Sequence, residues 1–308
     1  MILGLVLVAA ASAADFEYIR EGNPQDVVTK TQPGYALLGG GDDITAGFEF
    51  LIRKSGGGDF LVLRATGTGA YNPYVRKTGT VNSAATLILK TREASSDPTV
   101  LDTVRKAEAI FFSGGDQWNY VSRWKGTPLH KLLQERINAG IPVGGTSAGL
   151  AILGEFLFSA EFDTVQSPEA MADPFFKKVT VATGFLKIPH LNGLITDSHF
   201  MERKRMGRLL VFLSRMPVAN PRGLGVDEEV GVLLEPDGKA TVTGKGSAWF
   251  VRATHKPEVC EPGKPLTFTG VEVYEVDSKG SFDLKSWTGT NGRKHTASVE
   301  GGKLRLVP

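Results

Sequence analysis

The sequence predicts an α/β protein with a mostly parallel sheet, helices on both faces of that sheet, and a β-rich C-terminal extension. Short apolar runs alternate with helix-length segments as far as about Val230, as in doubly wound sheets. Beyond that point the pattern changes to the alternation typical of β-hairpins. Glycine clusters follow several apolar runs, which is typical of strand ends that approach a ligand.

The first element is expected to be removed from the mature chain. Residues 1–14 are apolar and include Ala11-Ser12-Ala13, a pattern typical of signal-peptide cleavage, and the run is too short to cross a bilayer. We therefore expect a signal-peptide remnant and an exported protein, periplasmic or extracellular; the alternative is a buried first strand. The single cysteine, Cys260, permits no intramolecular disulfide, which is compatible with a bacterial periplasm.

After a polar leader that ends near Gln32, strands and helices are expected to alternate. The expected strands are Tyr35–Leu38, Phe60–Arg64, Thr86–Leu89, Ala109–Phe112, Pro142–Gly144, Leu194–Thr196 and Gly223–Val226. The expected helices are Ile44–Lys54, Pro98–Lys106 and Pro128–Ala139. Ligands bind at the carboxyl ends of such strands, so the glycine clusters at 39–41, 113–117 and 145–149 mark the predicted site.

These elements divide the chain into a catalytic α/β domain at 15–235 and an extension at 236–308. In the extension, Pro236-Asp237-Gly238 reads as a hairpin turn. Its strands are expected either to add to the main sheet or to form a small subdomain. The net charge of +2 and the absence of a basic run give no argument for nucleic-acid binding, and no segment after the signal is apolar enough to cross a membrane.

The stretch Gly145-Thr146-Ser147-Ala148-Gly149 is the strongest candidate for chemistry. It follows a predicted strand and precedes an apolar segment that can start a helix, as a nucleophile elbow requires. A serine hydroxyl needs a base, a group that orients the base, and donors for the oxyanion. Because G-x-S-x-G is common by chance, a purely structural turn is the alternative.

Of the five histidines, His199 is the best candidate for the base. It directly follows the predicted strand at 194–196, so it falls at the carboxyl edge of the sheet. If the segment is helical, His199 and Arg203 lie one turn apart. The other arginines of the segment, Arg205 and Arg208, either serve the site or belong to a solvated helix face.

Together these stretches resemble a known family. GGDQ at 114–117, GTSAG at 145–149, D-x-H-F-x-x-R-x-R-x-G-R at 197–208 and G-x-D-E at 225–228 resemble the motifs of cyanophycinases in order and spacing. Cyanophycinases are serine peptidases of the S51 type, related to peptidase E. The resemblance implies a class I glutamine-amidotransferase-like, flavodoxin-like fold and a Ser-His-Glu triad.

Carried over by motif, Ser147 is the nucleophile, His199 the general base and Glu228 the acid that orients it. Asp163 and Glu161 are the competing acids. The backbone N–H groups of Gly115 or Asp116, together with that of Ala148, are expected to form the oxyanion hole. No metal or cofactor is called for, and a homodimer is implied by the resemblance alone.

The resemblance also implies the substrate, an acidic and arginine-containing peptide. Cyanophycin is a poly-aspartate chain with arginine on each side-chain carboxyl, and cyanophycinases cut it to β-Asp-Arg dipeptides. Arginine side chains suit carboxylates, and Asp197 and Gln117 suit a guanidinium or an amide. The carboxylate-binding residues are then Arg203, Arg205 and Arg208. One departure matters: the family usually has glutamine before the histidine, and this chain has Ser198, which puts strict cyanophycin specificity in doubt.

Three other functions compete with this one. An aspartyl or isoaspartyl peptidase of the peptidase E type is the nearest alternative. An α/β-hydrolase esterase shares the G-x-S-x-G elbow, and Asp163 before His199 fits its chain order, but the sequence has no HGGG oxyanion loop. A non-catalytic peptide-binding protein is the third alternative, which the Ser147, His199 and Glu228 set argues against.

Overall fold

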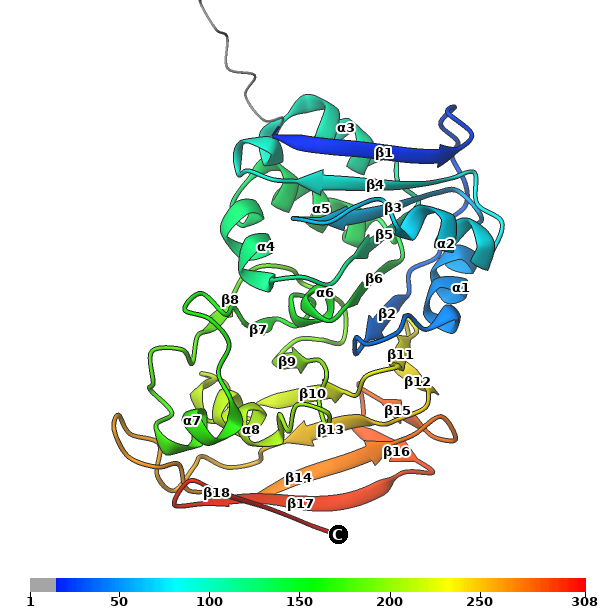
Figure 1. Cartoon of the computed structure of the whole chain (residues 1–308). Coiled ribbons are helices and arrows are strands. Elements are labelled where there is room, and N and C mark those ends of the chain that lie inside the picture. The colour runs from blue at the N-terminus through cyan, green and yellow to red at the C-terminus, as the bar shows by residue number, and fades with distance from the viewer. Residues whose placement is uncertain (1–14) are drawn as a thin grey trace, which may run out of the picture.

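The computed structural model describes residues 15–308, so the predicted signal segment at 1–14 lies outside the described residues. Its strands form two sheets (Figure 1). The α/β class and the β-rich C-terminal region are both confirmed. The parallel strands, however, are divided between the two sheets, which the sequence did not predict.

The first sheet has a parallel centre and antiparallel flanks. Its parallel strands are, in spatial order, β4 (Ser83–Leu89), β3 (Asp59–Arg64), β5 (Ala109–Phe112), β6 (Val143–Thr146) and β2 (Tyr35–Leu38). At one edge, β1 (Phe16–Gly22) pairs antiparallel with β4. Beyond β2 lie the antiparallel strands β11 (Val230–Leu234), β12 (Lys239–Gly244), β15 (Ser281–Asp283) and β16 (Thr288–Thr290).

Helices cover both faces of this sheet, as expected (Figure 1). On β3, Phe60 and Val62 pack in the cluster that includes α1 (Thr45–Lys54) and α2 (Tyr71–Thr78), whereas Leu61 and Leu63 face the other helices. Those are α3 (Pro98–Lys106), α4 (Gln117–Trp124) and α5 (Pro128–Asn138). The pleat of each strand sends successive side chains to opposite faces, so both faces are apolar.

The helix starts are specified locally. Asp97 accepts hydrogen bonds from the backbone N–H groups of the first turn of α3, and Pro98 occupies the first helical position. Thr127 caps α5 in the same way, again followed by proline. A short 3₁₀ helix, η1 (Glu93–Ser96), precedes α3.

The second sheet carries the other parallel strands, β7 (Phe156–Phe158), β9 (Leu194–Asp197) and β10 (Arg222–Val226). Strand β8 (Val181–Thr183) pairs antiparallel with β7. On the β10 side, antiparallel strands follow: β13 (Ala248–Arg252), β14 (Phe268–Val276), β17 (Arg293–Glu300) and β18 (Lys303–Val307). Helix α8 (Met206–Arg215) packs on this sheet, with α7 (Ser167–Ala172) against it.

The C-terminal extension therefore contributes strands to both sheets. Its strands β12, β15 and β16 continue the first sheet, and β13, β14, β17 and β18 continue the second. The polar leader before Gln32 contains β1, a strand that the sequence did not predict. The side chains of β1 are partly or fully exposed, so this edge strand lacks the continuous apolar run of a central strand. No helix within residues 15–308 has the length and apolar character needed to cross a membrane.

Candidate active site

Ser147 lies at a sharp turn between β6 and the short helix α6 (Ala148–Ala151). Its φ of 54° is in the left-handed region that a serine rarely adopts. Two flanking glycines allow the turn: a Cβ on Gly149 would overlap the carbonyl oxygen of Phe112, and one on Gly145 would crowd the Gly149 carbonyl. The chain thus projects the serine as a nucleophile elbow does.

His199 and Glu228 complete a hydrogen-bonded relay with Ser147. The Nε2 atom of His199 lies 2.7 Å from Ser147 Oγ, and its Nδ1 atom lies 2.6 Å from Glu228 Oε1. A carboxylate at Nδ1 holds the proton there, so Nε2 is left as the acceptor for the serine hydroxyl proton. The order along the chain is serine, histidine, acid, which differs from the α/β-hydrolase order.

A glycine loop after β2 ties the three residues together. The carbonyl of Leu38 accepts the N–H of Ser147 at 3.1 Å, and that of Gly39 accepts the N–H of His199 at 2.8 Å. The carbonyl of Gly40, whose φ is 98°, accepts the N–H of Glu229 at 2.8 Å. A Cβ on Gly40 would overlap the His199 ring. The GGG cluster at 39–41 is therefore required by close approach to the relay.

Burial prepares His199 for the role of base. Desolvation of the buried imidazole lowers its pKa below the usual 6.5, and the Arg203 and Arg205 charges act in the same direction. The hydrogen bond to Glu228 opposes them and raises the pKa. Because the lowering prevails, the imidazole is neutral and able to accept a proton at neutral pH.

The predicted oxyanion donors lie beside the nucleophile. Gly115, Asp116 and Ala148 line the same cavity as Ser147, and the Asp116 carboxylate caps α4 by accepting the N–H of Trp118. Among the described residues, no hydrogen bond engages the backbone N–H of Gly115 or Asp116. These donors are therefore available to a developing oxyanion, and their role stays a prediction.

The cavity at the relay has a volume of about 230 Å³ and is lined by groups of both charge signs, three arginines and three aspartates. Arg203, Arg205 and Arg208 line it, as does Gln117, whose side-chain amide donates to the carbonyl of Phe158 at 3.2 Å. The neighbouring Ser198 also lines the cavity, and its carbonyl accepts from Arg205 at 2.7 Å. Of the predicted site residues, only Glu228 and Glu161 are not part of the lining.

Asp197 is placed as a partner of the arginines. Its carboxylate is buried and accepts two hydrogen bonds from Arg208, at 2.8 and 2.6 Å, and one from Arg205 at 3.3 Å. Such a bidentate buried pair neutralises both charges. This placement does not favour the predicted direct contact between Asp197 and a substrate guanidinium. Among the described residues, Asp197 is the one carboxylate paired with both Arg205 and Arg208, so these two guanidinium groups keep capacity for an anionic group.

Among the described residues, neither competing acid forms a hydrogen bond with the His199 imidazole. Asp163 is paired with Lys178 at 2.8 Å, and this hydrogen bond lowers the pKa of its exposed carboxyl. Glu161 is exposed, and its backbone N–H donates to Ser159 Oγ. Since Nδ1 of His199 is already bonded to Glu228, the geometry favours Glu228 as the acid.

The segment after His199 is not the helix that the sequence allowed. Residues 199–205 form turns, with φ of 46° at His199 and 52° at Lys204, and α8 begins only at Met206. His199 and Arg203 are still related by one helix-like hydrogen bond, in which the backbone N–H of Arg203 donates to the His199 carbonyl at 3.1 Å. The positive φ values at His199 and Lys204 are incompatible with a right-handed α-helix, which explains why α8 begins only after them.

Sequence reasoning did not single out Asp227, although it lies within the G-x-D-E motif. Its carboxylate accepts hydrogen bonds from the backbone N–H of Met201, the Trp249 indole and the backbone N–H of Ser247, at 3.0–3.1 Å. Burial raises its pKa to about 6. Asp227 thus fastens the turn that carries His199 to the C-terminal extension, directly beside Glu228. The burial of its carboxylate could not be read from the motif.

Comparisons with known proteins agree with this geometry. Residues 61–242 match the family model "Peptidase family S51", which is more than half of the chain. A cyanophycinase from Trichormus variabilis is 29% identical over 203 residues, and a cyanophycinase from Geminocystis herdmanii is 29% identical over 226 residues. These alignments cover 64% and 70% of this chain, and 64% and 79% of the two relatives. The resemblance seen in the motifs is confirmed.

A solved structure supports the fold. The crystal structure of a peptidase from an acI-B1 Actinobacterium superposes with a TM-score of 0.58 at 16% sequence identity. It covers 82% of this chain and 98% of that chain.

Replacement of Glu228 by glutamine tests the relay. His199 must be neutral to accept the serine proton, so kcat/KM should fall as the pH drops through its lowered pKa, below 6.5. Glu228→Gln removes the interaction that raises this pKa. We expect the acid limb to move to still lower pH and kcat to fall by about 10²- to 10⁴-fold. Glu161→Gln and Asp163→Asn are the controls, and the acid assignment fails if either of them, but not Glu228→Gln, abolishes activity.

Asp227→Asn tests whether the turn that carries His199 needs this anchor. Both oxygens of the Asp227 carboxylate accept N–H groups, whereas the asparagine amide has one oxygen and one NH₂ group. The NH₂ group would face a donor and lose at least one hydrogen bond, so the free energy of unfolding should fall by about 1–3 kcal/mol. At a temperature where the variant is folded, kcat should fall several-fold with little change in KM. Glu229→Gln, whose exposed carboxylate pairs with Lys245, is the matched control. Wild-type kcat in Asp227→Asn would show that the anchor is dispensable.

Proposed function

Because this chain belongs to peptidase family S51, we propose that it is a serine peptidase that cleaves cyanophycin or related β-aspartyl peptides. The products would be β-Asp-Arg-like dipeptides, released through an acyl-enzyme. The observation that carries this proposal is the Ser147–His199–Glu228 relay, which opens into a cavity lined by three arginines.

The geometry supports the following steps. His199 Nε2 takes the proton of Ser147 Oγ as the oxygen bonds to the carbonyl carbon of the substrate, and the ionised Glu228 stabilises the imidazolium. The N–H groups of Ala148 and of Gly115 or Asp116 receive the oxyanion. The imidazolium then protonates the leaving amine as the C–N bond breaks. Water, activated by the same imidazole, hydrolyses the acyl-enzyme and restores the serine.

The arginines support an acidic residue at the cleavage site. Arg203 is about half exposed, and its Nε lies 4.0 Å from Glu228 Oε1 at the cavity rim. Arg205 is deeper, and desolvation lowers its pKa to about 10. Arg205 shares its carboxylate partner, Asp197, with Arg208, so a substrate carboxylate would supply a second counter-charge to this pair, which favours aspartyl over neutral residues.

An aspartyl or isoaspartyl peptidase is the second candidate. The cavity of about 230 Å³ is smaller than the ~300–1,000 Å³ typical of drug-sized ligand sites, and it suits a single aspartyl residue. Ser198 replaces the longer side chain that cyanophycinases carry beside the histidine. A small cavity lined by arginines would therefore accept short β-aspartyl peptides without a specific contact to the arginine of the substrate. Export by the segment at 1–14 and homodimer formation remain predictions.

Product analysis tests the proposal and separates the two candidates. The purified protein is incubated with cyanophycin, with β-Asp-Arg oligomers and with α-aspartyl dipeptides, and the products are identified by mass spectrometry. We expect β-Asp-Arg from cyanophycin, and a loss of at least about 10³-fold in kcat for Ser147→Ala, because the hydroxyl that forms the acyl-enzyme is gone. Circular dichroism checks that this variant is folded.

Two results would contradict the proposal. Full activity of Ser147→Ala would exclude the nucleophile. Turnover of dipeptides without any release from cyanophycin would favour the aspartyl peptidase.

A further inference from the structure

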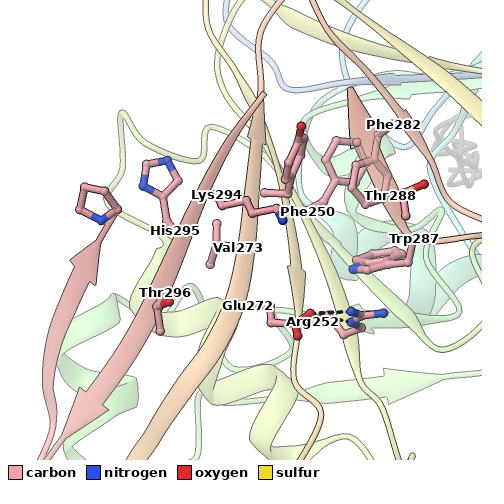
Figure 2. Close-up of a pocket in the computed structure, with 13 residues that line it drawn as sticks. Phe250, Arg252, Glu272, Val273, Phe282, Trp287, Thr288, Lys294, His295 and Thr296 are labelled. Carbon is pink, nitrogen blue, oxygen red and sulfur yellow. Dashed lines mark hydrogen bonds and ion pairs between the residues drawn. The ribbon is translucent and has the colours of Figure 1, made fainter. Parts of the chain in front are cut away.

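A second cavity, of about 590 Å³, lies in the C-terminal extension (Figure 2). It is bounded by one face of β13, β14 and β17 and by the β15–β16 hairpin. All of its lining residues lie between 250 and 308, beyond the residues that match the family model. Its volume is typical of a ligand site and exceeds that of the cavity at Ser147. The hydrolytic steps above make no use of it.

Strand register arranges the floor of this cavity in two rows. In the first row, Phe250, Tyr274 and Lys294 are direct cross-strand partners. In the second, Arg252 lies opposite Glu272, which lies opposite Thr296. Residues two apart on a strand share a face, so both rows point into the same space.

Aromatic rings form one side of the cavity. Trp287 packs edge-on against Phe282, with ring centres 5.1 Å apart, and Phe282 stacks on Phe250 at 3.8 Å. Figure 2 shows these three rings near one another, with the Arg252–Glu272 pair below Trp287 in this view. Trp287 and Tyr274 are only partly buried. The Arg222 guanidinium lies over the Trp287 ring, 5.0 Å from its centre, so the ring surface left to a ligand is the part that Arg222 does not cover.

Two charged groups of the cavity floor, Glu272 and Lys294, have polar atoms without a partner among the described residues. Both Nε and Nη2 of Arg252 donate to the same oxygen, Glu272 Oε2, at 2.9 and 2.6 Å. Within residues 15–308 the other oxygen, Oε1, accepts no hydrogen bond, and Lys294 forms no ion pair. The cavity therefore presents a free carboxylate oxygen, a free ammonium group and aromatic faces within one space.

We propose that this cavity is a second docking site for the arginyl-aspartate polymer, an inference that rests on the proposed substrate class. A substrate guanidinium would lie against the aromatic rings and donate to Glu272, since guanidinium groups are weakly hydrated and stack on such faces. A neighbouring carboxylate would bind Lys294. A ligand with both charges at short spacing matches the floor better than a purely acidic or purely basic peptide does.

A second site would matter because the substrate is a long chain. A polymer held in the extension presents its other segments to Ser147 at a raised effective concentration, which increases the rate on polymer without altering the chemistry. A short peptide cannot occupy both sites, so it gains nothing. The second site should therefore raise the rate of polymer degradation and leave the rate on short peptides unchanged.

The test uses the full chain carrying Ser147→Ala, which binds without turnover, and insoluble cyanophycin granules. Bound protein is measured by co-sedimentation in low salt. Lys294→Glu repels the substrate carboxylate and should raise the apparent Kd at least about fivefold, as should Trp287→Ala. The matched control is Lys303→Glu, a charge reversal at another exposed lysine, on β18 and outside the cavity.

The same Lys294→Glu substitution in the active chain gives the second readout. It should slow degradation of granules and leave kcat/KM on a short β-Asp-Arg oligomer unchanged. The docking site is overturned if Lys294→Glu binds granules as tightly as Lys303→Glu does, or if none of the Ser147→Ala proteins binds them. Absence of turnover on both substrates, with granule binding still dependent on Lys294, would instead count against the proposed hydrolysis.

Discussion

The glycine loop that follows β2 is the constraint on which the active site depends. Ser147 comes from the first sheet, whereas His199 and Glu228 follow strands of the second, so the relay exists only if the two sheets are held in register. Three consecutive carbonyls, those of Leu38, Gly39 and Gly40, accept backbone N–H groups from the segments that carry the relay. Side chains at Gly39 and Gly40 would overlap the segments that they hold. The separation of the parallel strands into two sheets is thus compatible with a hydrogen-bond distance of 2.7 Å between serine and histidine.

The strand ends and the candidate triad could be predicted because they depend on local chemistry. Buried parallel strands are continuous apolar runs, and the elbow is a short motif with a steric reason for each glycine. The division into two sheets could not be predicted, since strand pairing depends on contacts far apart in the sequence. Nor could the left-handed turn at His199, which no glycine marks. Asp197 shows the same limit: its residue type suited a substrate cation, but the fold placed Arg208 against it.

The C-terminal extension contacts the segment that carries the candidate relay. One face of β13 presents Trp249 to Asp227, and Ser247 joins Asp227 to Glu275 of β14, which in turn is held by Arg293 and His295. The opposite face of the same strand presents Phe250 to the second cavity. Because alternate residues of one strand serve the two sites, a single sheet connects the position of the relay with the proposed docking of polymer.

Covalent labelling of the serine tests the central claim most directly, that His199, oriented by Glu228, activates Ser147. The folded protein is treated with a fluorophosphonate, and the modified residue is mapped by peptide mass spectrometry while the labelling rate is followed. The account predicts one label per chain, at Ser147, and a labelling rate at least about 10²-fold lower in His199→Ala, because the hydroxyl then lacks its base. Labelling at another residue, or an unchanged rate in His199→Ala, would contradict it.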